Sequence, residues 1–121
     1  MADSVIRVFL LDDHEIVRRG VADLLNGVPD LGVVGEAGSV AEALRLLPSA
    51  TPDVAVLDGR LPDGTGMTLA DQAEESGIKA LIITGYAFQL AELGRYEFLM
   101  KPVRPAELVS AIERILGAPA G

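Results

Sequence analysis

The chain has 121 residues, half of them hydrophobic, which suffices for one domain with a buried core and argues against intrinsic disorder. Ten basic and 18 acidic residues give a net charge of −8, which argues against binding of nucleic acid or an anionic membrane by this domain and suits a cation site. The lack of cysteine excludes disulfides, thiol chemistry and zinc fingers, and without a targeting segment or a membrane-spanning apolar stretch we expect a soluble, cytoplasmic domain.

Short apolar runs alternate with helical patterns along the chain, which predicts βα units around a parallel sheet. The first strand is expected over 5–11. A helix should follow from about His14 and stop at Asn26-Gly27, with one apolar stripe buried against the sheet. The residues of this stripe are Ile16, Val17, Gly20, Val21, Leu24 and Leu25.

The second strand is expected over 31–37, near a sheet edge because two glycines and a glutamate interrupt its apolar character. The run from Ser39 to Glu42 has the capping-box pattern that starts a helix, and this helix should end before Pro48. Its expected buried stripe consists of Val40, Ala43, Leu44 and Leu47.

The third strand is an apolar run over 54–57 that ends on Asp58. Proline and two glycines make 61–66 a loop, and a helix over 68–76 should follow it. The fourth strand is expected over 79–83. The stripe of the helix between these strands is weak and consists of Leu69, Ala70 and Ala73.

The fifth strand is expected over 98–100, or from Tyr96. The segment between the fourth and fifth strands has room only for a short fourth helix, around 88–93. Pro105 suits the first position of a last helix, and 118–121 should form a flexible tail. The stripe of the last helix consists of Leu108, Val109, Ile112, Ile115 and Leu116.

Polar side chains stand at the carboxyl ends of four of these strands. Asp12 and Asp13 follow the first strand, Asp58 the third, Thr84 the fourth and Lys101 the fifth. Because the carboxyl ends of parallel strands meet at the edge of an open sheet where ligands bind, we expect all five side chains at one site. Three clustered carboxylates require a proton or a cation, and all-oxygen ligation favours Mg²⁺. With an ammonium group and a hydroxyl beside it, such an aspartate is equipped to accept a phosphoryl group as an acyl phosphate.

Four motifs on these strand ends carry a resemblance to a known family. They are Leu10-Leu-Asp-Asp-His14, Val56-Leu-Asp-Gly-Arg-Leu-Pro62 with Gly66, Ile83-Thr-Gly85 and Met100-Lys-Pro102. In this order they resemble the receiver (CheY-like) domains of two-component response regulators, over essentially the whole chain. The resemblance implies an α/β flavodoxin-like (βα)5 fold, a doubly wound parallel sheet with strand order 2-1-3-4-5, in a receiver domain over residues 1–117.

The resemblance also implies a role for each site residue. Asp58 would be the phosphoacceptor and would attack the phosphorus of a phosphohistidine on a sensor histidine kinase or a histidine phosphotransfer protein. Lys101 would pair with Asp58 and then with the phosphoryl group, and the Lys101–Pro102 bond would be cis. Thr84 would swing to bond a phosphoryl oxygen, and Phe98 would occupy the aromatic switch position of the family.

Magnesium is the cofactor that the resemblance implies. Asp13 and Asp58 would bind Mg²⁺ directly, together with the backbone carbonyl of Arg60, and Asp12 would act mostly through water. His14 is expected to be a solvated residue at a helix start, and not a metal ligand or a phosphohistidine. The acidic pair could also merely cap the first helix, a role worth about 0.3 to 1 kcal/mol.

The two halves of the chain resemble different groups of receivers. Up to about Gly66 the chain is similar to receivers attached to LuxR-type helix-turn-helix outputs, and beyond it to stand-alone receivers with a Thr-Gly-x-Tyr-like motif, here starting at Thr84. Thr84 and Lys101 are 17 positions apart, several fewer than in most receivers, so the fourth helix should be cut down. Many receivers dimerise or contact their outputs through that face, so the downstream partner and a homodimer both stay open.

Other functions compete with a phosphorylation-controlled signalling module that turns over no external substrate. An aspartyl-phosphate phosphatase or phosphotransferase of the haloacid-dehalogenase type needs a second aspartate two residues after the nucleophile, where Arg60 stands. A flavin carrier of the same fold needs a phosphate loop rich in serine and threonine after the first strand, where this chain has acids. A pseudo-receiver that acts by protein contact alone would not need the full set of acceptor, acidic pair, threonine and lysine.

Overall fold

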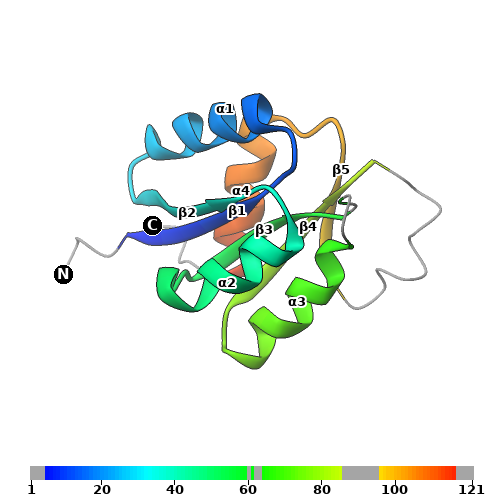
Figure 1. Ribbon diagram of the computed structural model, residues 1–121. Helices are drawn as coiled ribbons and strands as arrows, with labels where there is room; N and C mark the ends of the chain where they lie inside the picture. Colours follow the sequence, from blue (N-terminus) through cyan, green and yellow to red (C-terminus); the bar gives the residue numbers. More distant parts are fainter. Residues whose placement is uncertain (1–4, 60, 62–63, 86–95, 117–121) are drawn as a thin grey trace.

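One parallel sheet forms the centre of the molecule (Figure 1). The computed structural model describes residues 5–59, 61, 64–85 and 96–116. The strands are β1 (Ile6–Leu11), β2 (Leu31–Ala37), β3 (Val54–Asp58), β4 (Lys79–Thr84) and β5 (Glu97–Met100). They lie in the order β2-β1-β3-β4-β5, and every pairing is parallel. The predicted sheet order is therefore confirmed, and β2 is an edge strand as predicted.

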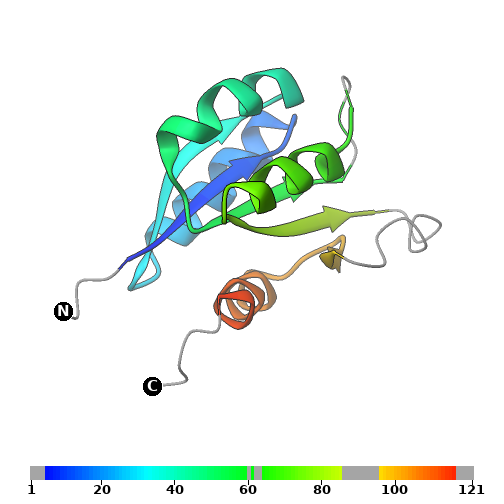
Figure 2. The same ribbon diagram turned by 90° about the horizontal axis from the view of Figure 1, so that it is seen from below.

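Four helices cover the two faces of the sheet in the part of the chain that the structure describes. They are α1 (Glu15–Asn26), α2 (Val40–Ala50), α3 (Gly66–Glu75) and α4 (Pro105–Ile115). Helices α1 and α4 pack on one face and α2 and α3 on the other, and Figure 2 shows α4 on the side of the sheet opposite to α3. This is the doubly wound arrangement that the sequence predicts. The short helix expected around 88–93 and the tail expected over 118–121 lie outside the described residues.

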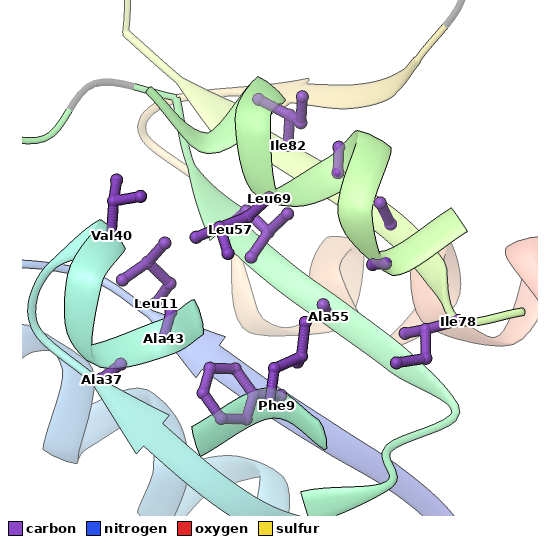
Figure 3. Close-up of a cluster of buried hydrophobic side chains, with 14 of the residues drawn as sticks. Phe9, Leu11, Ala37, Val40, Ala43, Ala55, Leu57, Leu69, Ile78 and Ile82 are labelled. Atoms are coloured by element: carbon purple, nitrogen blue, oxygen red, sulfur yellow. The ribbon is translucent and has the colours of Figure 1, made fainter. Parts of the chain in front are cut away.

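Alternating side chains of β1 enter two separate hydrophobic cores. Phe9 and Leu11 point toward α2 and α3, and Figure 3 shows them in the same cluster as Leu57. Val8 and Leu10 point toward α1 and α4. All five residues of β3 are buried, because helices cover both faces of this central strand. The end of β3 at Asp58 is consequently held in place by the packing around it.

A bulge between β1 and β2 makes room for a buried aromatic ring. Val8 pairs with Val33, whereas Phe9 pairs with Gly35, so β2 contains one extra residue at this point. A β-carbon at Gly35 would lie 2.8 Å from two ring atoms of Phe9. The shift also brings Ala37 level with the last residue of β1, at the carboxyl edge of the sheet.

The predicted buried stripe of α1 is wrong in the first half of the helix, where Ile16, Val17 and Gly20 are all exposed. Ile16 and Val17 are 88% and 54% exposed, and the buried residues of this helix are Ala22 and Leu25. Helix α1 begins at the carboxyl edge of the sheet, so its first turn lies at the rim. Only the later turns of the helix cover the face of the sheet.

Helix α2 differs from its prediction in two details. Leu44 is 40% exposed, because it lies about 100° around the helix from the buried position before it. The helix also continues through Pro48 to Ala50, since a proline in the last turn removes only one hydrogen bond near the helix end. Its start is as predicted, with the Ser39 Oγ accepting a hydrogen bond from the Glu42 N–H at 3.1 Å.

The remaining elements begin and end within two residues of their predicted bounds. Helix α3 buries Leu69, Ala70 and Ala73 completely, although this stripe is weak in the sequence. In the described ranges, no helix combines the length and the apolarity that crossing a bilayer requires.

Candidate functional site

The carboxyl edge of the sheet brings four potential metal-ligating side chains together. Asp12, Asp13 and His14 follow β1, and Asp58 ends β3, the strand that pairs with β1. One ligand atom from each of the four lies within 4.8 Å of the others. The structure therefore gathers the three predicted carboxylates and adds the imidazole of His14.

Asp58 is a buried carboxylate at the end of a buried strand. It is 6% exposed. Beside it, the Gly59 N–H donates a hydrogen bond to the Ile83 carbonyl at 2.8 Å, and Gly66 at the start of α3 lies against the Asp58 carbonyl. Because a buried carboxylate needs compensating charges or hydrogen bonds, the groups around Asp58 determine its chemistry.

Lys101 places a positive charge beside Asp58. The Lys101 Nζ lies 3.4 Å from the Asp58 Oδ2, and the lysine side chain is 40% exposed. The Lys101 N–H donates to the Thr84 carbonyl at 2.7 Å, which fixes the lysine backbone to the end of β4. The Lys101–Pro102 bond is cis, as the resemblance implies. An ammonium group in this place can offset charge on a phosphoryl group carried by Asp58.

Thr84 and Phe98 lie on one face of the sheet, and Thr84 is at the edge of the sheet where Asp58 stands. Thr84 is the last residue of β4, is 2% exposed, and pairs with Met100. Phe98 shares this face because side chains alternate along a strand, and it packs against the core beneath α3. A β-carbon at Gly59 would lie 3.2 Å from the Thr84 Cβ, so Thr84 is a direct neighbour of the residue after Asp58.

The loop after β1 is shaped by its own polar groups. The Asp12 Oδ1 accepts a hydrogen bond from the His14 N–H at 2.8 Å. The His14 Nδ1 lies 3.3 Å from the Asp12 Oδ1 and 3.2 Å from the Asp13 Oδ1. His14 is 69% exposed, so it is solvated as expected, but its ring also lies against both carboxylates. In the sequence, only the position of His14 directly after Asp12 and Asp13 points to this contact.

These side chains fit a magnesium ion by their chemistry. The three carboxylates offer hard oxygen ligands. The Asp12 and Asp13 side chains are 21% and 28% exposed, which leaves room for the water ligands that Mg²⁺ retains. Three like charges in one cluster repel one another, so a cation would be favoured there. The carbonyl of Arg60, the other expected ligand, lies outside the described residues.

A groove of about 800 Å³ opens from the site between α1 and the segment that leads into α4. Asp58 and Lys101 belong to its lining, so the buried carboxylate can be reached from outside. Most of its other lining residues are apolar, among them Val17, Leu24 and Val103. The groove thus leads from the surface of the molecule to the Asp58 carboxylate.

Comparison with known proteins finds relatives over most of the chain. A family model described as the response regulator receiver domain matches residues 8–113. The DNA-binding transcriptional activator DevR/DosR of Mycobacterium tuberculosis is 46% identical over 118 residues, which cover 92% of this chain and 54% of that protein. The transcriptional regulatory protein LiaR of Bacillus subtilis is 35% identical over 115 residues, which cover 89% of this chain and 54% of that protein. The chain therefore spans about half the length of these curated relatives.

Solved structures have the same architecture. The signal receiver domain of the response regulator NarL from Mycobacterium tuberculosis matches with a TM-score of 0.83 and 31% identity, covering 96% of this chain and 99% of that chain. A LuxR-family two-component response regulator from Aurantimonas sp. SI85-9A1 matches with a TM-score of 0.81 and 37% identity, covering 94% of this chain and 86% of that chain. The similarity to LuxR-type regulators therefore extends past Gly66 into the second half of the chain.

Proposed function

This chain belongs to the response regulator receiver domain family of two-component systems, and we propose that Asp58 is its phosphoacceptor. This assignment rests on the charged groups that surround the buried carboxylate of Asp58. The Lys101 Nζ lies 3.4 Å from the Asp58 Oδ2, and Asp12 and Asp13 belong to the same cluster of ligand atoms. A carboxylate with an ammonium group next to it, and with further carboxylates nearby that can bind a metal ion, is equipped for phosphoryl transfer.

The phosphodonor would be a phosphohistidine of a sensor histidine kinase or a histidine phosphotransfer protein. An oxygen of Asp58 attacks the phosphorus, the bond between phosphorus and the histidine nitrogen breaks, and the nitrogen keeps that electron pair. The product is an acyl phosphate on Asp58. The ammonium group of Lys101 then offsets negative charge on the phosphoryl oxygens.

The residues that would hold Mg²⁺ are Asp12, Asp13, Asp58 and the backbone carbonyl of Arg60. Asp13 and Asp58 would bind directly, and Asp12 mostly through water. When bound, Mg²⁺ would neutralise charge that develops on the transferring phosphoryl group. The exposure of Asp12 and Asp13 supports a site that keeps several water ligands.

Thr84 and Phe98 would convert phosphorylation into a change of surface. The Thr84 hydroxyl would donate a hydrogen bond to a phosphoryl oxygen. Its movement would change the packing around Phe98 on the same face of the sheet. A downstream protein, or a second copy of this chain in a homodimer, would read the change there. Such a domain promotes its own phosphorylation and turns over no external substrate.

The printed names of the relatives describe transcriptional regulators, and DevR/DosR is named as a DNA-binding activator. We do not assign DNA binding to the part of such proteins that this chain covers. Its net charge of −8 opposes contact with the phosphate backbone of nucleic acid. Its lack of cysteine suits a reducing cytoplasm.

The test is to incubate the protein with Mg²⁺ and acetyl phosphate as a small phosphodonor, and to measure the intact mass. Wild-type protein should form a phosphoryl adduct, and an Asp58→Asn variant should form none. Asp23→Asn, which changes an exposed acid of α1, serves as the control and should react like wild type. No adduct in any variant would favour a pseudo-receiver, and an adduct on Asp58→Asn would show that another residue is the acceptor.

A further inference from the structure

We propose that Arg18 is a positioning residue for the loop over residues 12–14, called the acidic loop below. In this role it holds Asp12 and Asp13 in the arrangement that binds Mg²⁺. This inference rests on the proposed function, because it concerns the same metal site. Arg18 is the fourth residue of α1, which begins at Glu15. In the sequence it is simply one of several charged residues on that helix.

The guanidinium group of Arg18 bonds to two segments of the chain besides its own helix. Its Nη1 donates to the backbone carbonyl of Asp12 at 2.7 Å and to that of Ala37 at 3.3 Å. Its Nε donates to the Glu36 Oε1 at 3.1 Å. The side chain is only 14% exposed, so these oxygens replace water around its charge. Arg18 therefore ties the acidic loop to the end of β2.

Arg18 fastens the acidic loop at both of its ends. Its backbone N–H donates to the His14 carbonyl at 2.8 Å, while its side chain bonds the Asp12 carbonyl. The Asp12 N–H in turn donates to the Ala37 carbonyl at 3.1 Å. Both backbone polar groups of Asp12 are thus held, one by α1 and one by β2. A loop held in this way leaves its two carboxylates little freedom to move apart.

Charge makes this restraint relevant to metal binding. The carboxylates of Asp12, Asp13 and Asp58 repel one another, and without restraint the loop would relieve this repulsion by opening. A charged donor on the Asp12 backbone opposes that movement, because charge-assisted hydrogen bonds are stronger than neutral ones. Ligands that are already in place lose less conformational freedom when the metal binds. Removing Arg18 should therefore weaken Mg²⁺ binding.

The Glu36 carboxylate orients the guanidinium group of Arg18. The bulge in β2 sets Glu36 level with Leu10, and Ala37 level with Leu11, at the carboxyl end of β1. The Glu36 carboxylate and the Ala37 carbonyl consequently face the same guanidinium group. A purely structural role is the alternative, in which Arg18 only clamps α1 to β2. The two roles differ in their readout, because a clamp changes the melting temperature and leaves the affinity of the folded protein for Mg²⁺ unchanged.

The experiment measures the Kd for Mg²⁺ by isothermal titration calorimetry, at a temperature where circular dichroism shows each variant folded. Arg18→Met removes all of these side-chain bonds and should raise the Kd about tenfold, as is typical when a residue behind a metal ligand is lost. Arg18→Lys keeps the charge without the forked geometry and should give an intermediate Kd. Arg114→Met is the matched control, because Arg114 pairs with Glu97 at 3.4 Å with both side chains more than half exposed. This control should keep the wild-type Kd.

Equal Mg²⁺ affinity in wild type and Arg18→Met, with only a lower melting temperature, would overturn this inference alone. A wild-type chain that takes up no Mg²⁺ would overturn the proposed metal site as well. If Arg18→Met does not fold, Glu36→Gln decides, since it leaves Arg18 in place and removes the charge that orients it. A higher Kd in Glu36→Gln supports the inference, and an unchanged Kd overturns it.

Discussion

Gly66 lies so close to Asp58 that a β-carbon added to the glycine would overlap with the Asp58 carbonyl oxygen. The same β-carbon would lie 3.2 Å from the Cβ of Leu57. The first residue of α3 therefore packs directly on the backbone that carries the proposed phosphoacceptor. Any side chain at this position must push either α3 or Asp58 out of place.

Gly66→Ala is expected to destabilise the protein by about 1–3 kcal/mol, the usual cost of overpacking a tight interior. It should also slow adduct formation with acetyl phosphate, because Asp58 would shift relative to Lys101. Urea denaturation and the phosphorylation rate measure the two effects. Gly20→Ala is the control, because nothing lies within 4 Å of a β-carbon there, and it should stabilise α1 by up to about 1 kcal/mol. A Gly66→Ala variant with wild-type stability and rate would contradict the close contact.

Lys101→Met should slow the phosphorylation of Asp58 by acetyl phosphate on the order of 100-fold, since one group that stabilises transition-state charge is lost. Adduct mass followed over time gives the rate. Lys79→Met removes an exposed lysine at the start of β4, at the opposite end of the sheet, and should leave the rate unchanged. If the two variants react equally fast, the ammonium group beside Asp58 has no part in the transfer.

The sheet and its polar edge can be predicted from the sequence for a definite physical reason. A strand covered on both faces must be apolar along its length, so the first polar residue after the run marks its carboxyl end. Asp58 follows such a run, and all five residues of β3 are buried. Parallel pairing then brings the ends of neighbouring strands together, which is why Asp12, Asp13 and Lys101 lie near Asp58.

The interactions behind this edge cannot be predicted in the same way, because they depend on how elements meet. Helical spacing tells which residues share a face of α1, but it does not tell that the first turn lies at the rim, where Ile16 and Val17 are exposed. Arg18 bonds to residues 18 and 19 positions away, and no local pattern marks it. Its partner Glu36 reaches it only because the bulge at Gly35 shifts the register of β2.

Gly35→Ala tests this bulge. A β-carbon there would lie 2.8 Å from the buried Phe9 ring, and we expect a loss of about 1–3 kcal/mol in the free energy of unfolding. Gly32→Ala in the same strand is the control, because its nearest neighbour is a terminal carbon of the exposed Val5 at 3.3 Å. The double variant Phe9→Leu with Gly35→Ala should lose less than the sum of the single losses, since the smaller side chain leaves room for the methyl group. Strictly additive losses would mean that the ring and the glycine do not contact each other.

Asp13→Asn should change the stability of the protein in opposite directions with and without metal. In EDTA the variant should be more stable than wild type by up to about 1 kcal/mol, the repulsion of two unit charges about 4 Å apart in water. At a Mg²⁺ concentration about 100 times the Kd, wild type should gain about 2.7 kcal/mol, whereas the variant, which lacks a direct ligand, gains less and becomes the less stable protein. Thermal unfolding in EDTA and in Mg²⁺ gives both values, and Asp23→Asn should show no such reversal. A variant that is more stable than wild type in both conditions would mean that Asp13 does not hold the metal. A variant that is less stable in both would mean that Asp13 does not repel its neighbours.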